Sequence, residues 1–142
     1  MVQLSGTDRH LTSISIETGR GSEREGVAAP VRAAATQMRE YFAGTRTTFD
    51  LPLEPPRTPR GAALRAAMCA IGYGETANYG AVAAATGSSA RALGQACARN
   101  PFPIVVPCHR ITSANGPEKY SAGDGPSTKR RLLDHEQRFK TR

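Results

Sequence analysis

The chain has 142 residues, enough for one ordinary domain or two small ones. Its 19 basic and 12 acidic residues give a net charge of +7, which favours polyanionic partners, chiefly nucleic acid. No apolar run approaches the ~18 residues of a membrane helix, and the polar start lacks the core of a secretory signal. We therefore expect a cytoplasmic protein with no membrane association. The absence of tryptophan argues against the aromatic stacking platforms of single-strand binders.

The N-terminal region, residues 1–57, is predicted to be a small, reduced α/β unit. Residues 11–17 alternate between polar and apolar side chains and predict one short, half-buried strand. Residues 30–42 predict a helix, because Pro30 suits a first turn and apolar residues recur at helical spacing. The other segments are predicted as connections: a Gly-rich loop over 18–26, an extended piece over 49–53 and a stiff linker with four prolines over 51–59.

The remainder, residues 58–142, is predicted to be a second and mostly helical domain. Helices are predicted over 61–71, 79–86, 89–99 and 126–139, with a short strand over 104–106. A Gly-Ser-Ser turn joins the two middle helices, which predicts a helix-turn-helix. The fold class is thus α/β (α+β), with a winged-helix-like domain after the N-terminal unit.

The second helix of this pair is unusually slim, because small residues such as Ala90 and Gly94 fill much of residues 89–99. A helix that reads bases in the major groove would carry long polar side chains. A slim helix can instead approach a minor groove, which is about 6 Å wide. Small residues would equally let the helix pack closely on its neighbours, and both interpretations stay open.

Cys108 is the candidate nucleophile, because a thiolate is a strong nucleophile and His109 follows it directly. A free cysteine has a pKa of about 8.5, so His109 would have to accept its proton, directly or through water. Adjacent side chains of a strand diverge, so Pro107 must end the strand and allow a turn at Cys108 and His109. The alternative is a buried thiol beside a core histidine.

The imidazole of His109 needs an acceptor that fixes its tautomer and stabilises its charged form. The residues by themselves leave five acidic candidates for this acceptor: Glu75, Glu118, Asp124, Asp134 and Glu136.

The other two cysteines, Cys69 and Cys97, lie in Ala-rich helical segments and are predicted to be small buried residues. No Cys/His spacing indicates a zinc site, so we expect no metal. His135 is predicted to lie on the surface of the last helix.

Residues 100–110, Asn-Pro-Phe-Pro-Ile-Val-Val-Pro-Cys-His-Arg, resemble the active-site segment of the O6-alkylguanine–DNA alkyltransferases, also called methylated-DNA–protein-cysteine methyltransferases. The resemblance extends with gaps from about Tyr73 to Glu136. It implies DNA repair by irreversible transfer of an alkyl group from O6-alkylguanine in duplex DNA to Cys108. It also implies a protein that is consumed after one turnover and needs no cofactor. We expect a monomer whose partner is double-stranded DNA.

The same resemblance assigns roles around the cysteine. It nominates Glu136 as the partner of His109, Asn100 as the brace of the reactive turn, and Arg110 as a structural residue. For the substrate it nominates the Val106 main chain, which reads the exocyclic amine of guanine. Two further residues contact the base: Tyr120, which donates a proton, and Ser121, whose backbone contacts O6.

For DNA, the resemblance implies that the slim helix enters the minor groove with Ala90 and Gly94 on its DNA-binding face. Arg91 matches the family's finger arginine, which fills the gap left by a flipped base. Tyr79 matches the tyrosine that pushes on the phosphate of the flipped nucleotide. Without the family, Arg91 would be a solvated cation and Tyr79 a half-buried helix cap.

Two loops depart from the family pattern. The turn over 87–91 is shorter than usual, and the loop over 120–126 is longer and includes Asp124. Both changes concern recognition of the base, while the Pro-Cys-His-Arg segment is kept. The alternatives are therefore a sensor of alkylated DNA and a protein that accepts the alkyl group from a small molecule. A non-reactive DNA-binding module and a cysteine hydrolase are the other rival classes.

Overall fold

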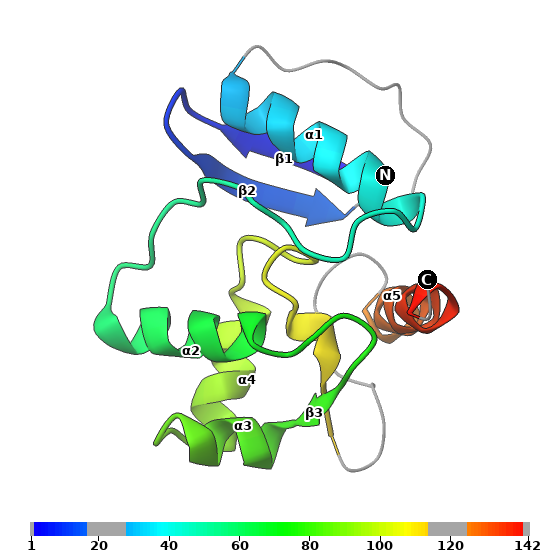
Figure 1. Cartoon of the computed structure of the whole chain (residues 1–142). Helices are drawn as coiled ribbons and strands as arrows, with labels where there is room; N and C mark the ends of the chain where they lie inside the picture. Colours follow the sequence, from blue (N-terminus) through cyan, green and yellow to red (C-terminus); the bar gives the residue numbers. More distant parts are fainter. Residues whose placement is uncertain (1, 17–27, 114–124, 141–142) are drawn as a thin grey trace.

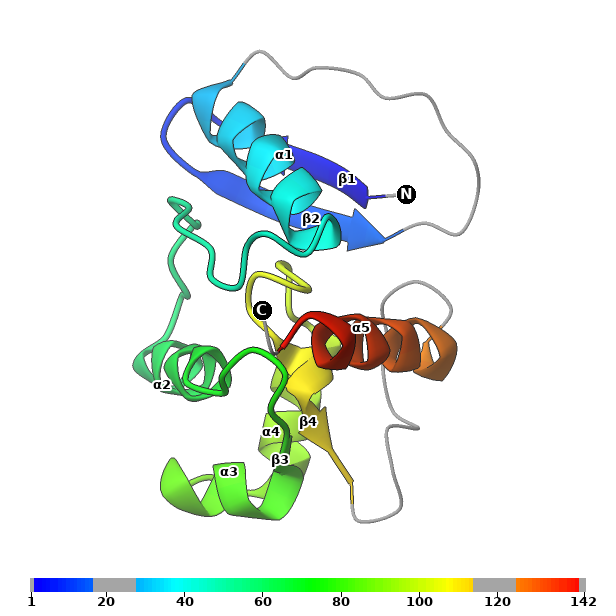
Figure 2. The same cartoon turned by 45° about the vertical axis from the view of Figure 1, so that its right-hand side comes forward.

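A computed structural model describes residues 2–16, 28–113 and 125–140 of the chain (Figure 1). The predicted mixed α/β fold class is confirmed, with small sheets and helices in both halves of the chain. A hairpin covered by one helix lies at one end of the molecule, and the helix-turn-helix lies at the other (Figures 1 and 2). Among the described residues, no helix has the length and apolar character needed to cross a membrane.

The N-terminal unit consists of strands β1 (Val2–Gly6) and β2 (Leu11–Ile16) and helix α1 (Ala29–Phe42). The strands pair antiparallel, and α1 lies across one face of the hairpin (Figure 1). The strand predicted over residues 11–17 is confirmed as β2, but β1 was not predicted, because the first residues are largely polar. Apolar side chains in β1 do alternate with polar ones, the period of a half-buried strand.

The extended piece predicted over residues 49–53 lies beside β2. Leu11 bridges to Leu53, and the Leu11 backbone N–H donates to the Pro52 carbonyl at 2.7 Å. Further along β2, the Ile14 N–H donates to the Pro101 carbonyl at 2.7 Å. The hairpin is therefore hydrogen-bonded both to the linker and to the segment that carries Cys108.

The second half is mostly helical and contains one short parallel strand pair. Its elements are α2 (Pro59–Cys69), β3 (Ala77–Asn78), α3 (Tyr79–Ala85), α4 (Ala90–Ala98), the 3-10 turn η1 (Cys108–Arg110), β4 (Ile111–Thr112) and α5 (Pro126–Phe139). Three side chains cap helix N-termini by accepting a backbone N–H: Thr58, Asn78 and Ser89. Asn78 caps α3, accepting the Ala81 N–H at 2.7 Å.

The prediction of a strand over residues 104–106 was wrong. The β-branched run is a succession of turns in which Ile104 has a φ of 77°. Prolines at 101, 103 and 107 cannot donate to a strand ladder, which is why an apolar β-branched run does not pair here. The run is apolar because Phe102, Ile104 and Val106 are buried. Pairing resumes only at Ile111, which faces Ala77 of β3.

Candidate active site

The turn that carries Cys108 is set by Pro107, as predicted. Pro107 has a φ of −83° and a ψ of 64°, and the Cys108 N–H folds back to the Val106 carbonyl at 2.8 Å. These angles describe an inverse γ-turn, which leads into the 3-10 turn η1. Cys108 is 3% exposed, so its thiol lies at the inner side of a tight, buried turn.

Asn100 connects the two ends of this turn. Its Nδ2 donates to the Val106 carbonyl at 2.8 Å and to Cys108 Sγ at 3.2 Å. Its Oδ1 accepts from the Phe102 N–H at 2.9 Å. The amide therefore fixes the backbone around the turn and directs an N–H at the sulfur, where it would stabilise a thiolate.

His109 contacts Glu136, which α5 supplies. The distance from His109 Nε2 to Glu136 Oε2 is 2.6 Å, and both side chains are fully buried. Of the rival carboxylates, Glu75 and Asp134 are exposed, and Glu118 and Asp124 lie outside the described residues. Because Glu136 occupies Nε2, Nδ1 is the ring nitrogen of His109 that is left to accept a proton, and it has no protein partner within the described residues.

Glu136 is held by several other donors besides His109. Arg110 Nε donates to Oε1 at 2.8 Å, Tyr41 Oη to Oε2 at 2.7 Å, and the Gly74 N–H to Oε1 at 3.2 Å. Burial by itself would raise the pKa of Glu136, but the hydrogen bonds from His109 and Arg110 outweigh burial and lower it. Glu136 is therefore a carboxylate throughout the physiological range.

The electrostatics of His109 follow from its burial. Burial lowers the pKa of His109, and the hydrogen bond and charge of Glu136 oppose that shift only in part. The imidazole is consequently neutral at pH 7 and can accept a proton. Arg110 also donates from Nη1 to the Ile71 carbonyl at 2.7 Å, which fits the structural role expected of it.

Two buried side chains of this region were not anticipated from the sequence: Tyr41 and Lys129. Tyr41 is fully buried, and it follows Ala34 and Met38 on the buried face of α1, a spacing that could have revealed it. Lys129 is also fully buried, and its ammonium group donates to the Ile111 carbonyl. It shares the inner face of α5 with Glu136, so helical spacing could have placed it there.

Three other predictions need correction or adjustment. Cys69 is exposed instead of buried, because it lies on a different face of α2 from the buried Leu64 and Met68. Cys97 is half-buried, and burial together with the nearby Cys108 raises its pKa to about 12, so Cys97 remains a thiol. His135 is half-buried instead of exposed, because its Nε2 hydrogen-bonds to the Tyr41 carbonyl at 2.8 Å.

The helix pair α3–α4 exposes the residues expected to meet DNA. Ala90 and Arg91 are exposed at the start of α4, and Tyr79 is half-buried at the start of α3 with Lys129 Nζ 5.8 Å from its ring centroid. Apart from its own helix backbone, a Cβ added to Gly94 would meet no atom of the described residues within 4 Å. Close packing inside the protein is therefore not the reason for a glycine at this position.

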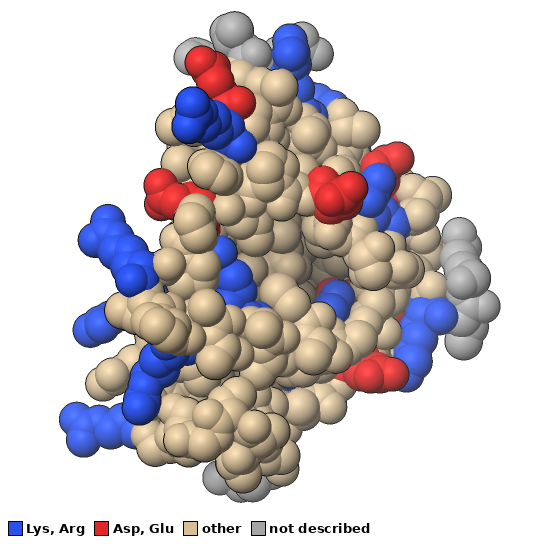
Figure 3. Space-filling view, turned by 60° about the vertical axis from the view of Figure 1, so that its left-hand side comes forward, with Lys and Arg blue, Asp and Glu red and all other residues tan. Residues whose placement is uncertain are grey.

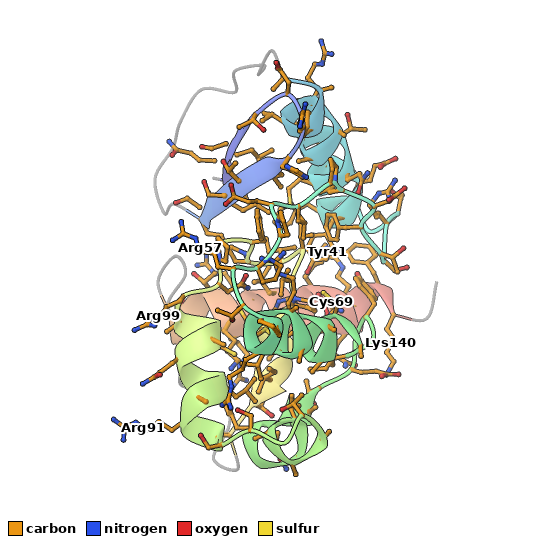
Figure 4. All side chains as sticks on the ribbon, turned by 90° about the vertical axis from the view of Figure 1, so that its left-hand side faces the viewer. Tyr41, Arg57, Cys69, Arg91, Arg99 and Lys140 are labelled. Carbon is orange, nitrogen blue, oxygen red and sulfur yellow. The ribbon has the colours of Figure 1, made fainter. Side chains whose placement is uncertain are left out.

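Arginines line the same side of the molecule. Arg57, Arg91 and Arg99 project along one edge, which we call the basic edge (Figure 4). All three are exposed, and in the space-filling view the cations cluster along the flank formed by the lower half of the molecule (Figure 3). Such an edge attracts a phosphate backbone.

The predicted substrate contacts divide into two groups. Tyr120 and Ser121 lie outside the described residues. The Val106 carbonyl is buried in the reactive turn and already accepts hydrogen bonds from Asn100 and Cys108. Within the described residues, no group of three or more His, Cys, Asp or Glu side chains could hold a metal ion.

Comparison with known proteins identifies the family of this chain. The profile of the 6-O-methylguanine DNA methyltransferase, DNA-binding domain, matches residues 61–138. A methylated-DNA–protein-cysteine methyltransferase of Mycolicibacterium paratuberculosis is 36% identical over 97% of this chain and 87% of its own length. The chain belongs to this methyltransferase family. Its reactive turn and the Glu136 carboxylate both lie within the matched residues.

Other members of the methyltransferase family are also similar to this chain. The constitutive enzyme of Bacillus subtilis is 45% identical over 72% of this chain, a match that spans 64% of the relative's length. The crystal structure of Mycobacterium tuberculosis OGT in complex with DNA superposes with a TM-score of 0.78 at 35% identity. That superposition covers 97% of this chain and 87% of the neighbour, so the likeness includes the N-terminal unit.

Proposed function

We propose that this protein repairs DNA by transferring an alkyl group, typically methyl, from O6 of guanine in duplex DNA to Cys108. The observation that supports it most is the buried Cys108 thiol, which receives an N–H from Asn100 and shares the turn η1 with His109, the partner of Glu136. That arrangement occurs in a chain of the methyltransferase family. It makes the enzyme a methylated-DNA–protein-cysteine methyltransferase that acts once.

The chemistry follows from these groups. His109 Nδ1 takes the thiol proton, directly or through water, and Glu136 stabilises the resulting imidazolium. The sulfur attacks the alkyl carbon, a new carbon–sulfur bond forms, and the bond from that carbon to O6 breaks. Guanine leaves with the electron pair and takes a proton from Tyr120, and the proton held by His109 then returns to Tyr120 through solvent. The thioether product cannot be hydrolysed, so the protein is consumed, and the balance requires no cofactor or metal.

The base must leave the duplex for this reaction. The O6 substituent lies inside the stack, and a thiolate has to approach the alkyl carbon from behind the departing oxygen. Extrusion costs a few kcal/mol and less for a weakly paired lesion. We assign the minor-groove contact to α4, with Ala90 and Gly94 against the groove, Arg91 in the place of the extruded base, and Tyr79 against its phosphate.

The pocket contacts are assigned to the Val106 main chain, Tyr120 and Ser121. Because the Val106 carbonyl already accepts two hydrogen bonds, the guanine amine would have to share one of its lone pairs. Cys108 must also remain reduced until a lesion arrives, which suits a cytoplasmic location.

The central test is intact-mass measurement after mixing with duplex DNA that contains O6-methylguanine. We expect each protein molecule to gain one methyl group, located on Cys108 and absent in Cys108→Ala. Tight binding of the lesion without any gain in mass would instead identify a sensor. Repeated turnover on a substrate would identify a hydrolase.

A second measurement separates DNA from a small alkylated molecule as the donor. Binding of duplex DNA should weaken steeply with salt, with a slope that falls when Arg57 and Arg99 of the basic edge are both changed to alanine. Removal of one phosphate-binding side chain should reduce the slope by about 0.9. Alkyl transfer that is independent of salt and of DNA would support the small-molecule donor.

A further inference from the structure

Tyr41 connects the N-terminal unit to the reactive site through a hydrogen bond to Glu136. It lies in the last turn of α1, far from Glu136 in the sequence, and its side chain is fully buried. Its hydroxyl donates to Glu136 Oε2 at 2.7 Å, and the same oxygen is 2.6 Å from His109 Nε2. Oε2 of Glu136 thus hydrogen-bonds both to Tyr41 of the N-terminal unit and to His109, the base that would activate Cys108.

The ring of Tyr41 is fixed by its aromatic neighbours. It meets the Tyr73 ring edge-on, with centroids 6.1 Å apart, and lies against Phe49 at 5.6 Å and His135 at 5.0 Å. Tyr41 lies where the N-terminal unit meets the helices of the second half (Figure 4). The packing leaves the ring little freedom, so its hydroxyl is held at Glu136.

The hydroxyl also withdraws charge from the carboxylate. Oε2 of Glu136 accepts from Tyr41, from His109 and, at 3.1 Å, from Arg110 Nη2. Each donor reduces the negative charge that the oxygen presents to the others. Burial, and then the charge of Glu136, raise the pKa of Tyr41, so it stays a donor across the working range of pH.

We propose that Tyr41 is a positioning residue for alkyl transfer, because its hydroxyl orients Glu136 and limits how strongly this carboxylate attracts a proton to His109. A neutral His109 can accept the thiol proton of Cys108, whereas a protonated one cannot. Without the hydroxyl, more charge faces His109, and the imidazole keeps its proton to higher pH. The proposal rests on the proposed function for the use made of Cys108.

The test is the variant Tyr41→Phe, which keeps the ring and removes only the hydroxyl. Reaction of Cys108 with iodoacetamide is followed against pH by mass spectrometry of the tryptic peptide 100–110, which contains no other cysteine. We expect the acid limb of the rate profile to move to higher pH, with about a threefold lower rate near pH 6.5 and equal rates near pH 9. An unchanged profile, or a loss by the same factor at every pH, would overturn the proposal.

Tyr73→Phe is the matched control. The Tyr73 hydroxyl is buried in the same aromatic cluster but has no hydrogen-bond partner among the described residues. Its removal should leave the profile unchanged, and thermal unfolding confirms that both variants are folded. Iodoacetamide needs no DNA, so the shift can occur even if transfer from O6-methylguanine fails. Methyl transfer to Cys108 without a shift of the iodoacetamide rate profile in Tyr41→Phe would reject only the role of Tyr41.

Discussion

The reactive turn over residues 100–110 and the helix α4 are neighbours in the sequence but differ in what holds their side chains. Cys108, His109 and Arg110 are buried, and their partners come from several elements. In α4, Arg91 is exposed and Gly94 faces open space. The residues of the turn are fixed by contacts within the protein, whereas the described residues show no such contacts for Arg91 and Gly94, for which we propose DNA as the partner.

The largest effect should come from Glu136→Gln, which tests whether the turn depends on its carboxylate. The change leaves Arg110 buried without its counter-charge, and breaking a buried pair in this way costs about 3–5 kcal/mol of unfolding free energy. Urea unfolding measures it. Asp134→Asn removes an exposed carboxylate from the same helix and should change stability by less than about 0.5 kcal/mol. Equal losses of unfolding free energy in the two variants would contradict the view that the reactive turn depends on the Glu136 carboxylate.

The same carboxylate and His109 predict loss of stability in acid. Both groups have a lowered pKa in the folded protein, so the unfolded chain binds more protons as the pH falls. Stability should decline first below about pH 6.5, where unfolded histidine protonates, and again below about pH 4.3, where unfolded glutamate does. Urea midpoints measured from about pH 8 down to about pH 2 report both declines. In Glu136→Gln the second decline should be smaller.

The two regions also differ in how far the sequence could predict them. The Cys108–His109 turn followed from Pro107, but the choice of Glu136 among five carboxylates required the family resemblance. The strand expected over 104–106 failed because β-branched residues indicate burial as well as pairing, and the prolines remove the donors that pairing needs. Helical spacing could have predicted that Tyr41 is buried, but not its contact with Glu136, because the two residues are far apart in the sequence and no local pattern encodes such a contact.

Arg91→Ala tests the other side of the comparison. Because Arg91 is exposed, the free energy of unfolding should change by less than about 0.5 kcal/mol. Methyl transfer from duplex DNA should nevertheless slow by about tenfold or more, since extrusion of the base costs a few kcal/mol. Arg32→Ala, which removes an exposed arginine from α1, serves as the control for charge. Transfer from the free O6-methylguanine base needs no extrusion, so a loss there would argue against a finger role.

Gly94→Ala should give the smallest effect and the most informative one, because its two consequences have opposite signs. An added Cβ meets nothing within 4 Å in the described residues outside its own helix, and alanine favours a helix over glycine by about 1 kcal/mol, so the free energy of unfolding should rise. If α4 enters a minor groove, the same methyl group crowds the DNA and weakens binding of the duplex, and Gly94→Leu weakens it further. Thermal unfolding and duplex titration measure the two quantities on the same samples. If glycine lowers the free energy of unfolding but strengthens DNA binding, then contact with DNA explains the glycine at this position. Unchanged DNA binding in both variants would show that Gly94 does not face the DNA.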